Sequence, residues 1–366
     1  MNRRFLYVVL FALVSFSSCM KDEEYWQLRN SMNIGSTQGV YITNEGNFTY
    51  NNASLSYYDT ENQLVYNEAF YNVNGHPLGD VAMSCKLKDS LLYVVMNNSG
   101  KIIILDADDF SYKKKITGLT SPRYIHFVNS QKAYVTDLYA HAITIVNPET
   151  CEITGYINVH NSASSFNQHP TEQMVSLGDR VFVSCWSFDN TVLVIDSKKD
   201  KVIDSIKVAS QPNSMVADKF DRLWVLSDGG YPGIPNGQDE PELICIEPIS
   251  LQVLHRVTMD IEDSPTELNI NGAGDTLYFL NRDLYRLCVD ITGPPEVVLE
   301  SPYPQYHTGG FYGLGIDPNS SEIYVADAID YNQPGVIYRY SADALPVDTI
   351  KVGINPGTFC FRIKTN

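Results

Sequence analysis

Aromatic and amide side chains are concentrated in a few long polar segments that could bind a ligand. These segments are residues 44–52, 137–141, 160–169, 186–190, 228–241, 303–307 and 330–333. Aromatic rings beside Asn and Gln suit a large, mostly neutral ligand that offers flat apolar surface and many amide groups. We therefore predict a ligand-binding face with contacts from Phe48, Tyr50, Tyr139, Trp186, Phe188, Tyr231, Tyr303, Tyr306 and Tyr331. The alternative is that Tyr and Asn are simply common in turns of this kind.

The residue types needed for catalysis or metal binding do not form a recognisable constellation. The histidines are scattered without HxxxH or HxH spacing, and no CxxC pair occurs among the cysteines. Asp137, Asp228 and Asp327 each end an aromatic strand, so they could converge to hold a divalent cation. Such carboxylates more often cap loops by accepting backbone hydrogen bonds. We therefore predict no catalytic residue, no metal site and no cofactor, and a cation-dependent enzyme remains the alternative.

The strands that must position these segments belong to a sequence pattern that recurs seven times. The pattern is an apolar-aromatic-apolar strand followed by a second apolar strand. Its aromatic positions are Tyr41, Tyr93, Tyr134, Phe182, Trp224, Tyr278 and Tyr324. The spacings of 52, 41, 48, 42, 54 and 46 residues match the length of a four-stranded propeller blade. We expect these rings to fill the packed space between blades, and we assign them no function.

The flanking strands complete the blades. Most copies are preceded by a strand that begins near a proline, at positions 122, 170, 212, 265 and 356. Proline fits there because the first residue of a strand need not donate a backbone N–H to the sheet. The second apolar strand commonly ends in Asp or Asn, which favours a tight turn into an outer strand. The sequence thus predicts an all-β, seven-bladed β-propeller. Because the first copy lacks an inner strand, residues 356–363 should complete the first blade and close the ring.

The N-terminal residues 1–18 are typical of a signal peptide. Arg3 and Arg4 precede an apolar run over residues 5–16, which is too short for a transmembrane helix. Cys19 follows two serines, and this arrangement resembles a bacterial lipobox in which Cys19 carries the lipid anchor. The alternative is plain secretion with Cys19 incidental.

Residues 19–38 are predicted to be a flexible, lipidated tether that leads into the propeller at residues 39–366. The acidic residues 22–24 resemble the export signal that sends lipoproteins of Bacteroidetes-type bacteria to the cell surface. The alternative is a solvated linker without a signal. This part of the chain therefore predicts localisation at the outer membrane, lipid-anchored and exposed on the cell surface.

The charge balance excludes some partners. With 43 acidic and 26 basic residues the formal charge is −17, so nucleic acid and anionic membrane surfaces would be repelled. The basic run at residues 113–115 is most simply the polar edge of a sheet. Several cysteines lie within apolar strands, where a thiol behaves as a small buried hydrophobe. Export would permit disulfides, but the sequence does not assign partners.

The blade phrase at residues 133–159 and 181–208 resembles the YncE-like, surface-layer-type propellers. Together with the lipobox and the acidic tether, the chain resembles the BtuG-type surface lipoproteins. That resemblance implies capture of cobalamin (vitamin B12) and its delivery to a TonB-dependent transporter of the BtuB type. It carries over no contact residue. The alternatives are a propeller that binds another nutrient or a protein partner, and a lactonase-like or lyase-like enzyme.

Overall fold

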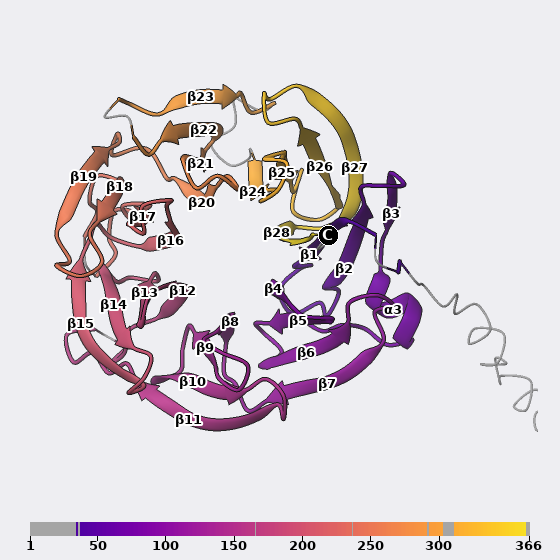
Figure 1. Cartoon of the computed structure of the whole chain (residues 1–366), viewed down its shortest axis with the longest axis horizontal. Helices are drawn as coiled ribbons and strands as arrows, with labels where there is room; N and C mark the ends of the chain where they lie inside the picture. Colours follow the sequence, from indigo (N-terminus) through magenta and orange to yellow (C-terminus); the bar gives the residue numbers. More distant parts are fainter. Residues whose placement is uncertain are drawn as a thin grey trace, which may run out of the picture.

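The computed structural model describes residues 34–35, 37–164, 166–235, 237–290, 293–302 and 311–363. These residues form seven four-stranded sheets arranged as a ring (Figure 1). The predicted all-β, seven-bladed propeller is therefore confirmed. Within the described ranges the helical element is the short α3 (Ala69–Asn74), which lies on the periphery of the ring.

Each blade contributes its innermost strand to the axis of the ring. These strands are β28 (Pro356–Arg362), β4 (Ala82–Lys88), β8 (Pro122–Phe127), β12 (Thr171–Leu177), β16 (Pro212–Ala217), β20 (Thr266–Ile270) and β24 (Phe311–Ile316). Pro122, Pro212 and Pro356 are the first residues of their strands, as predicted. Pro170 and Pro265 lie directly before β12 and β20, because the start of a strand tolerates the missing donor.

The second strand of each blade carries the repeated aromatic ring. The second strands are β1 (Gly39–Asn44), β5 (Leu91–Met96), β9 (Ala133–Asp137), β13 (Arg180–Cys185), β17 (Leu223–Ser227), β21 (Thr276–Asn281) and β25 (Ile323–Asp327). The third strands are β2 (Ser54–Asp59), β6 (Lys101–Asp106), β10 (Ala142–Asn147), β14 (Thr191–Asp196), β18 (Glu242–Ile246), β22 (Asp283–Cys288) and β26 (Pro334–Tyr340).

The fourth strands form the outer rim of the ring in Figure 1. They are β3 (Leu64–Tyr66), β7 (Tyr112–Thr117), β11 (Glu152–Asn158), β15 (Lys201–Lys207), β19 (Val253–Thr258), β23 (Glu296–Leu299) and β27 (Pro346–Ile354). Consecutive strands within a blade are antiparallel, so each strand runs between the two faces of the ring in the direction opposite to its neighbours. The loops from second to third strands therefore emerge on the face where the innermost strands begin, which we call the loop face.

The C-terminal strand closes the ring, as predicted. The first blade has the order β28-β1-β2-β3, so the last strand of the chain pairs with the first (Figure 1). Tyr41 lies opposite Cys360 and Val40 lies opposite Phe361 in this ladder. Pairing the two ends removes an exposed sheet edge, and it makes closure depend on residues from both ends of the propeller.

The hydrophobic core lies between neighbouring blades as seven separate clusters. The seven repeated rings are at most 4% exposed, so their predicted packing role is confirmed. Several of the rings also link blades through their polar atoms. The Tyr41 hydroxyl donates to the Ala107 carbonyl at 2.7 Å and the Tyr93 hydroxyl to the Pro148 carbonyl at 3.2 Å, each in the following blade. A buried tyrosine satisfies its hydroxyl in this way.

The last residues of the predicted tether pack against the propeller. Ile34 is 4% exposed in the cluster between the first two blades, and its N–H donates to the Asp108 carbonyl at 2.9 Å. The predicted signal peptide, the lipidation at Cys19 and the acidic signal at residues 22–24 lie outside the described residues. In the described ranges no helix has the length and apolar composition to cross a bilayer.

Candidate functional site at the loop-face mouth of the channel

Every innermost strand carries a register shift where it leaves the loop face. The pairing with the second strand shifts, for example, between Ala82 and Ser84 in β4 and between Thr266 and Asn269 in β20. Equivalent shifts occur in the other five blades. A β-bulge leaves an extra residue unpaired and re-aims its side chain. The positive φ of 59° at Glu267 belongs to this irregularity.

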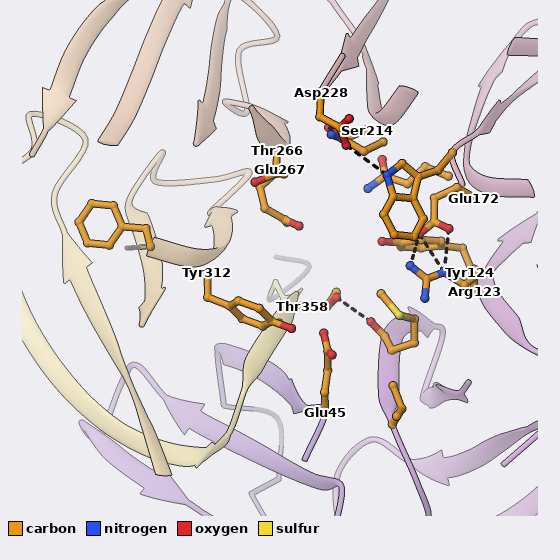
Figure 2. Close-up of a pocket in the computed structure, with 17 residues that line it drawn as sticks. Glu45, Arg123, Tyr124, Glu172, Ser214, Asp228, Thr266, Glu267, Tyr312 and Thr358 are labelled. Carbon is orange, nitrogen blue, oxygen red and sulfur yellow. Dashed lines mark hydrogen bonds and ion pairs between the residues drawn. The ribbon is translucent and has the colours of Figure 1, made fainter. Parts of the chain in front are cut away.

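The residues at these shifts surround a cavity of about 390 Å³ at the mouth of the central channel (Figure 2). They are Met83, Arg123, Tyr124, Glu172, Gln173, Asn213, Glu267, Tyr312 and Gly357. Glu45, Trp186 and Asp228, which follow second strands of three blades, complete much of the wall. The mouth is thus lined by charged and aromatic groups together with amides and hydroxyls.

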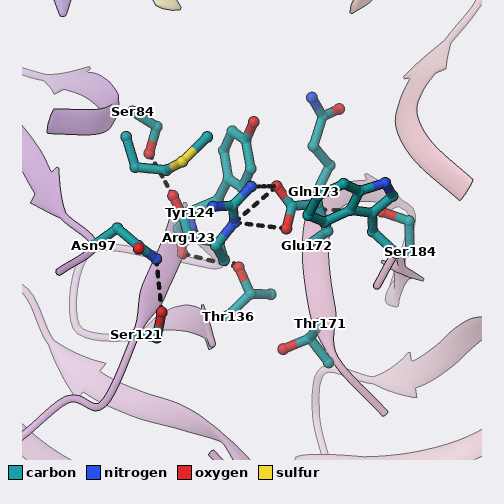
Figure 3. Close-up of polar contacts among 12 residues, drawn as sticks. Ser84, Asn97, Ser121, Arg123, Tyr124, Thr136, Thr171, Glu172, Gln173 and Ser184 are labelled. Carbon is teal, nitrogen blue, oxygen red and sulfur yellow. Dashed lines mark hydrogen bonds and ion pairs between the residues drawn. The ribbon is translucent and has the colours of Figure 1, made fainter. Parts of the chain in front are cut away.

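A buried ion pair joins two neighbouring blades at the mouth. The Arg123 guanidinium donates to both carboxylate oxygens of Glu172 at 2.7 Å, and the two side chains are 13% and 4% exposed (Figure 3). Burial alone would lower the pKa of Arg123, but the Glu172 carboxylate outweighs burial and raises this pKa. Arg123 also lies over the Trp186 ring at 5.6 Å, and the Trp186 indole donates to Asp228 at 3.2 Å.

Two further carboxyl groups face the cavity and are strongly affected by burial. Burial raises the pKa of Glu267 to about 8, and the charges of Glu45 and Glu172 add to the rise. Burial also raises the pKa of Glu45, while a hydrogen bond with the Tyr312 hydroxyl and the Arg123 charge oppose that rise. Glu267 is therefore protonated at neutral pH. The mouth consequently offers a carboxylic acid donor at Glu267 and the Glu172 carboxylate, which is paired with Arg123.

Hydrogen bonds between innermost strands hold the wall of the cavity. The Thr358 hydroxyl donates to the Met83 carbonyl at 3.0 Å, which joins the closing strand β28 to β4. The Ser84 hydroxyl donates to the Arg123 carbonyl at 2.7 Å, which joins β4 to β8 (Figure 3). These bonds fix the cavity-facing groups that lie on the innermost strands, which favours a preformed cavity.

Most of the predicted ring residues stand exposed on the loop face around this mouth. Phe48, Tyr50, Tyr139, Tyr231 and Tyr331 are 65%, 75%, 59%, 52% and 43% exposed. Single exposed rings are common on protein surfaces, whereas several on one face make that face a candidate binding surface. Tyr303 and Tyr306 lie outside the described residues.

Some of these rings contact other aromatic rings, in two separate groups. Phe166 stacks on Phe188 with centroids 5.9 Å apart, and Phe188 meets Tyr231 edge-on at 6.3 Å. Across the ring, Tyr331 meets Tyr312 edge-on at 5.8 Å, and Tyr312 reaches into the cavity. Of the predicted ring residues that the structure describes, Trp186 lines the cavity itself, and the others lie outside its lining. The structure therefore brings separate predicted segments together around one mouth.

The three aspartates considered as cation ligands are engaged in their own loops. Asp137 accepts from the backbone N–H groups of Ser121 and Tyr139 at 2.8 and 3.0 Å. Asp228 accepts from Gln211 and from the Gly230 N–H at 2.9 and 2.8 Å. Asp327 accepts from the Ile329 N–H at 2.7 Å. The loop-capping interpretation accounts for these contacts.

One group of possible metal ligands does come together among the described residues. Potential ligand atoms of His169, Cys185 and Asp189 lie within 4.8 Å of one another. His169 and Asp189 already contact each other at 2.6 Å, and the pair joins the loop before β12 to the loop after β13. In this arrangement the pair connects two loops of the loop face.

Sequence reasoning missed the charged residues that line the mouth. Arg123, Glu172 and Glu267 all lie one or two residues beyond a predicted inner-strand proline, so their position relative to that proline was an available signal. Glu45 lies within the predicted segment 44–52, but it was not singled out there. Alternation in a strand does not show a bulge, so the side to which these residues point could not be read from the sequence.

The chain belongs to a family whose function is unknown. Residues 38–358 match the family described as a domain of unknown function (DUF5074), which covers nearly the whole propeller. No curated protein matches the sequence. The class of the protein is therefore a DUF5074 β-propeller.

Solved structures support the fold without indicating the ligand. A quinoprotein alcohol dehydrogenase-like protein from Bacteroides thetaiotaomicron has a TM-score of 0.66 and 15% identity, with 90% of this chain and 79% of that chain covered. A protein from Bacteroides fragilis provisionally named 6-phosphogluconolactonase has a TM-score of 0.61 and 13% identity, with 89% and 98% covered. A hydrazine synthase from Kuenenia stuttgartiensis has a TM-score of 0.64 and 13% identity, with 76% and 89% covered. At such low identity these likenesses show the fold alone.

Proposed function

We propose that the protein binds cobalamin at the loop-face mouth of the propeller and acts as a capture protein rather than an enzyme. The observation that carries the proposal is the combination of exposed rings from several blades with a carboxyl-lined cavity at their centre. A corrinoid presents a broad, partly apolar ring edged by primary amides. Its apolar surface suits the exposed rings, and its amide N–H groups suit carboxylate acceptors.

The size and charge of the mouth fit this ligand class. A cavity of about 390 Å³ holds part of a corrinoid, so the rest of the ligand would lie against the rim rings Phe48, Tyr139, Phe188, Tyr231 and Tyr331. Several anchors from different blades are needed to hold a ligand of this size. The loop face is where the topology brings such loops together.

An anionic substrate fits the mouth poorly. Among the described residues that line the cavity, the cationic side chain is Arg123, which is already paired with Glu172, and Glu45 and Glu267 add carboxyl groups. A phosphorylated sugar acid, as in lactonase chemistry, would meet these groups without an unpaired cation from the described lining. This argument favours a neutral, amide-rich ligand over the enzymatic alternative.

A direct binding test separates cobalamin from the other ligands. Purified protein mixed with cyanocobalamin and then desalted should retain the red colour of the ligand. Retention of no more colour than an unrelated protein retains would remove the cobalamin proposal. Titration calorimetry of the same mixture should give a stoichiometry of one.

Single alanine variants locate the site. Tyr231→Ala or Phe188→Ala should weaken binding by about 2 kcal/mol, roughly 30-fold, because binding energy is concentrated in a few rings. Glu149→Ala and Lys199→Ala, in turns on the opposite face, should leave the affinity unchanged. We would abandon this site if no loop-face ring variant, including Trp186→Ala and Tyr331→Ala, weakened cyanocobalamin binding tenfold.

We further propose that the protein is a lipid-anchored protein of the cell surface that delivers cobalamin to a TonB-dependent transporter of the BtuB type. The support is the signal-peptide pattern, Cys19 and the acidic residues 22–24. Cys19→Ala should release the protein from the membrane fraction, because stable anchoring needs acyl chains. Alanine at residues 22–24 should leave it lipidated but protected from external protease. Full protease sensitivity of that variant would contradict the surface-export signal.

A further inference from the structure

Below the mouth, the central channel widens into a second cavity of about 720 Å³ that holds two cysteines. Cys85 lies in β4 of the second blade and Cys360 lies in β28 of the first blade, and both line this cavity. β4 and β28 are neighbouring innermost strands, already joined by the hydrogen bond from Thr358 to the Met83 carbonyl. The two thiols also belong to the same packed cluster between the first two blades.

The thiols are in direct contact. The Cys85 S–H donates a hydrogen bond to the Cys360 sulfur, and the Leu87 N–H donates to the same sulfur at 3.2 Å. The bond from Cys85, the Leu87 N–H and the Lys86 charge lower the pKa of Cys360 against the effect of burial. The contact with Cys360 and burial raise the pKa of Cys85. One sulfur is thus prepared as a nucleophile and the other lies beside it.

The other described cysteines lack this arrangement. Cys185 and Cys245 are fully buried between blades, where burial raises their pKa values. Cys151 and Cys288 do not line the second cavity. They lie farther from the axis, directly before β11 and at the end of β22. A pair of contacting thiols that lines an open channel therefore occurs at one place in the described chain.

We propose that Cys85 and Cys360 form a reversible disulfide that locks the closing strand β28 to the second blade. The Cys360 thiolate attacks one sulfur of a small-molecule disulfide, which forms a mixed disulfide and releases one thiolate. The Cys85 thiolate, after loss of its proton, then attacks the Cys360 sulfur and releases the second thiolate. The protons of the two cysteines end on the two released thiols, so the pair is oxidised by two electrons and the small disulfide is reduced.

The disulfide would stabilise the pairing between the two ends of the propeller, which are far apart in the sequence. β28 is held in the first blade by pairing with β1, which comes from the other end of the propeller. A covalent link between Cys85 and Cys360 closes a loop that contains most of the ring, and long loops gain most from such a link in the chain-entropy account. Oxidation should therefore stabilise the propeller without any ligand, so this inference is independent of the proposed function.

The test is oxidation of the full chain with glutathione disulfide. Peptide mapping after alkylation should find Cys85 linked to Cys360, and dithiothreitol should reverse the link. The oxidised protein should melt roughly 5 °C or more above the reduced protein. Before oxidation, limiting iodoacetamide should label Cys360 ahead of Cys85.

Matched variants make the result specific. Cys85→Ser and Cys360→Ser should each abolish the intramolecular link and the rise in melting temperature, whereas Cys288→Ser should retain both. If either variant fails to fold, the peptide map of the unaltered chain decides the question. A map without the Cys85–Cys360 peptide under full oxidation, or an unchanged melting temperature with the link formed, would overturn the proposal.

Discussion

The upper and lower halves of the central channel are built from the same seven strands but have different chemistry. The upper half begins at the register shifts and is lined by Arg123, Glu172, Glu267 and Tyr312. The lower half follows the regular parts of the same strands and is lined by apolar residues, the two thiols, Lys86 and His126, and it shares Glu267 with the upper half. The bulges therefore decide which groups face each half, and they place Arg123, Glu172 and Tyr312 at the mouth.

The two halves also differ in what they cost the fold. The upper half keeps a buried ion pair and a carboxyl group with a pKa of about 8, and such groups stabilise a fold less than apolar packing would. Perturbed carboxyl groups in a concave site are typical of function. The lower half also holds a titratable group perturbed by burial, His126, and otherwise packs and closes the ring. The following predictions test this division, from the largest expected effect to the smallest.

Deleting residues from Pro356 onward should have the largest effect, because β28 lines both halves and pairs with β1. Its loss exposes a strand edge and opens the cluster that contains Phe359 and Phe361. We expect an aggregated or greatly destabilised protein, measured by thermal unfolding and size-exclusion chromatography. A truncated protein with the melting temperature of the full chain would contradict closure by β28.

Arg123→Ala should destabilise the protein by about 3–5 kcal/mol, because it leaves the buried Glu172 carboxylate without its partner. Urea unfolding measures this loss. The double change Arg123→Met with Glu172→Leu should recover much of it, since no unpaired charge remains. Lys198→Ala removes an exposed pair with Asp179 and should leave the urea midpoint unchanged. If Arg123→Ala left the urea midpoint as unchanged as Lys198→Ala does, the buried ion pair would not have the free-energy cost assigned to the upper half.

Glu267→Gln should reduce the loss of stability that the wild type shows as the pH rises towards 8. The folded pKa of about 8 lies above the usual 4.5, so between these values the folded state holds a proton that the unfolded state has lost. Stability from this group is therefore lost as pH rises from 4.5 through 8. The wild-type melting temperature should fall more over this window than that of Glu267→Gln.

The matched change at exposed Glu240 should leave this pH profile as in the wild type. Glu45 and Glu172 repel the Glu267 carboxylate, so removing either charge should lessen the effect. Parallel profiles for wild type and Glu267→Gln would show that Glu267 titrates normally.

His126→Gln, in the lower half, should give the smallest effect and the opposite sign. Burial and the nearby Lys86 charge lower the pKa of His126 to about 4 from its usual 6.5. The unfolded state then gains a proton first, so stability is lost as pH falls from 6.5 through 4. The variant should lose less stability than the wild type in this window, whereas His76→Gln at an exposed site should not differ. An identical acid profile for His126→Gln and wild type would contradict this assignment.

The fold could be predicted because its determinants are local and repeated. The aromatic position of each second strand recurs at blade spacing, and the ring at each such position is buried between blades. The closing role of residues 356–363 followed from counting strands, and the pairing of Tyr41 with Cys360 confirms it. The exposed rings at Phe48, Tyr139 and Tyr231 were also visible as aromatic residues in polar segments.

The chemistry of the channel could not be predicted in the same way. Arg123 and Glu172 come from different blades, and Glu45 meets Tyr312 from the far end of the chain. Their contacts require the ring to be closed and the strand starts to be bulged. The contact of Cys85 with Cys360 has the same origin, because two strands distant in sequence become neighbours at the axis.

The sequence by itself determined the number of blades, the order of strands within a blade and the segments that form the loop face. These properties depend on alternation and spacing, which are preserved along the chain. Only the tertiary structure decided which side chains face the axis and which of them are charged at neutral pH. A bulge changes the direction of a side chain without changing the pattern of residues, and the pKa of Glu267 rises because closure of the ring buries it among other carboxyl groups.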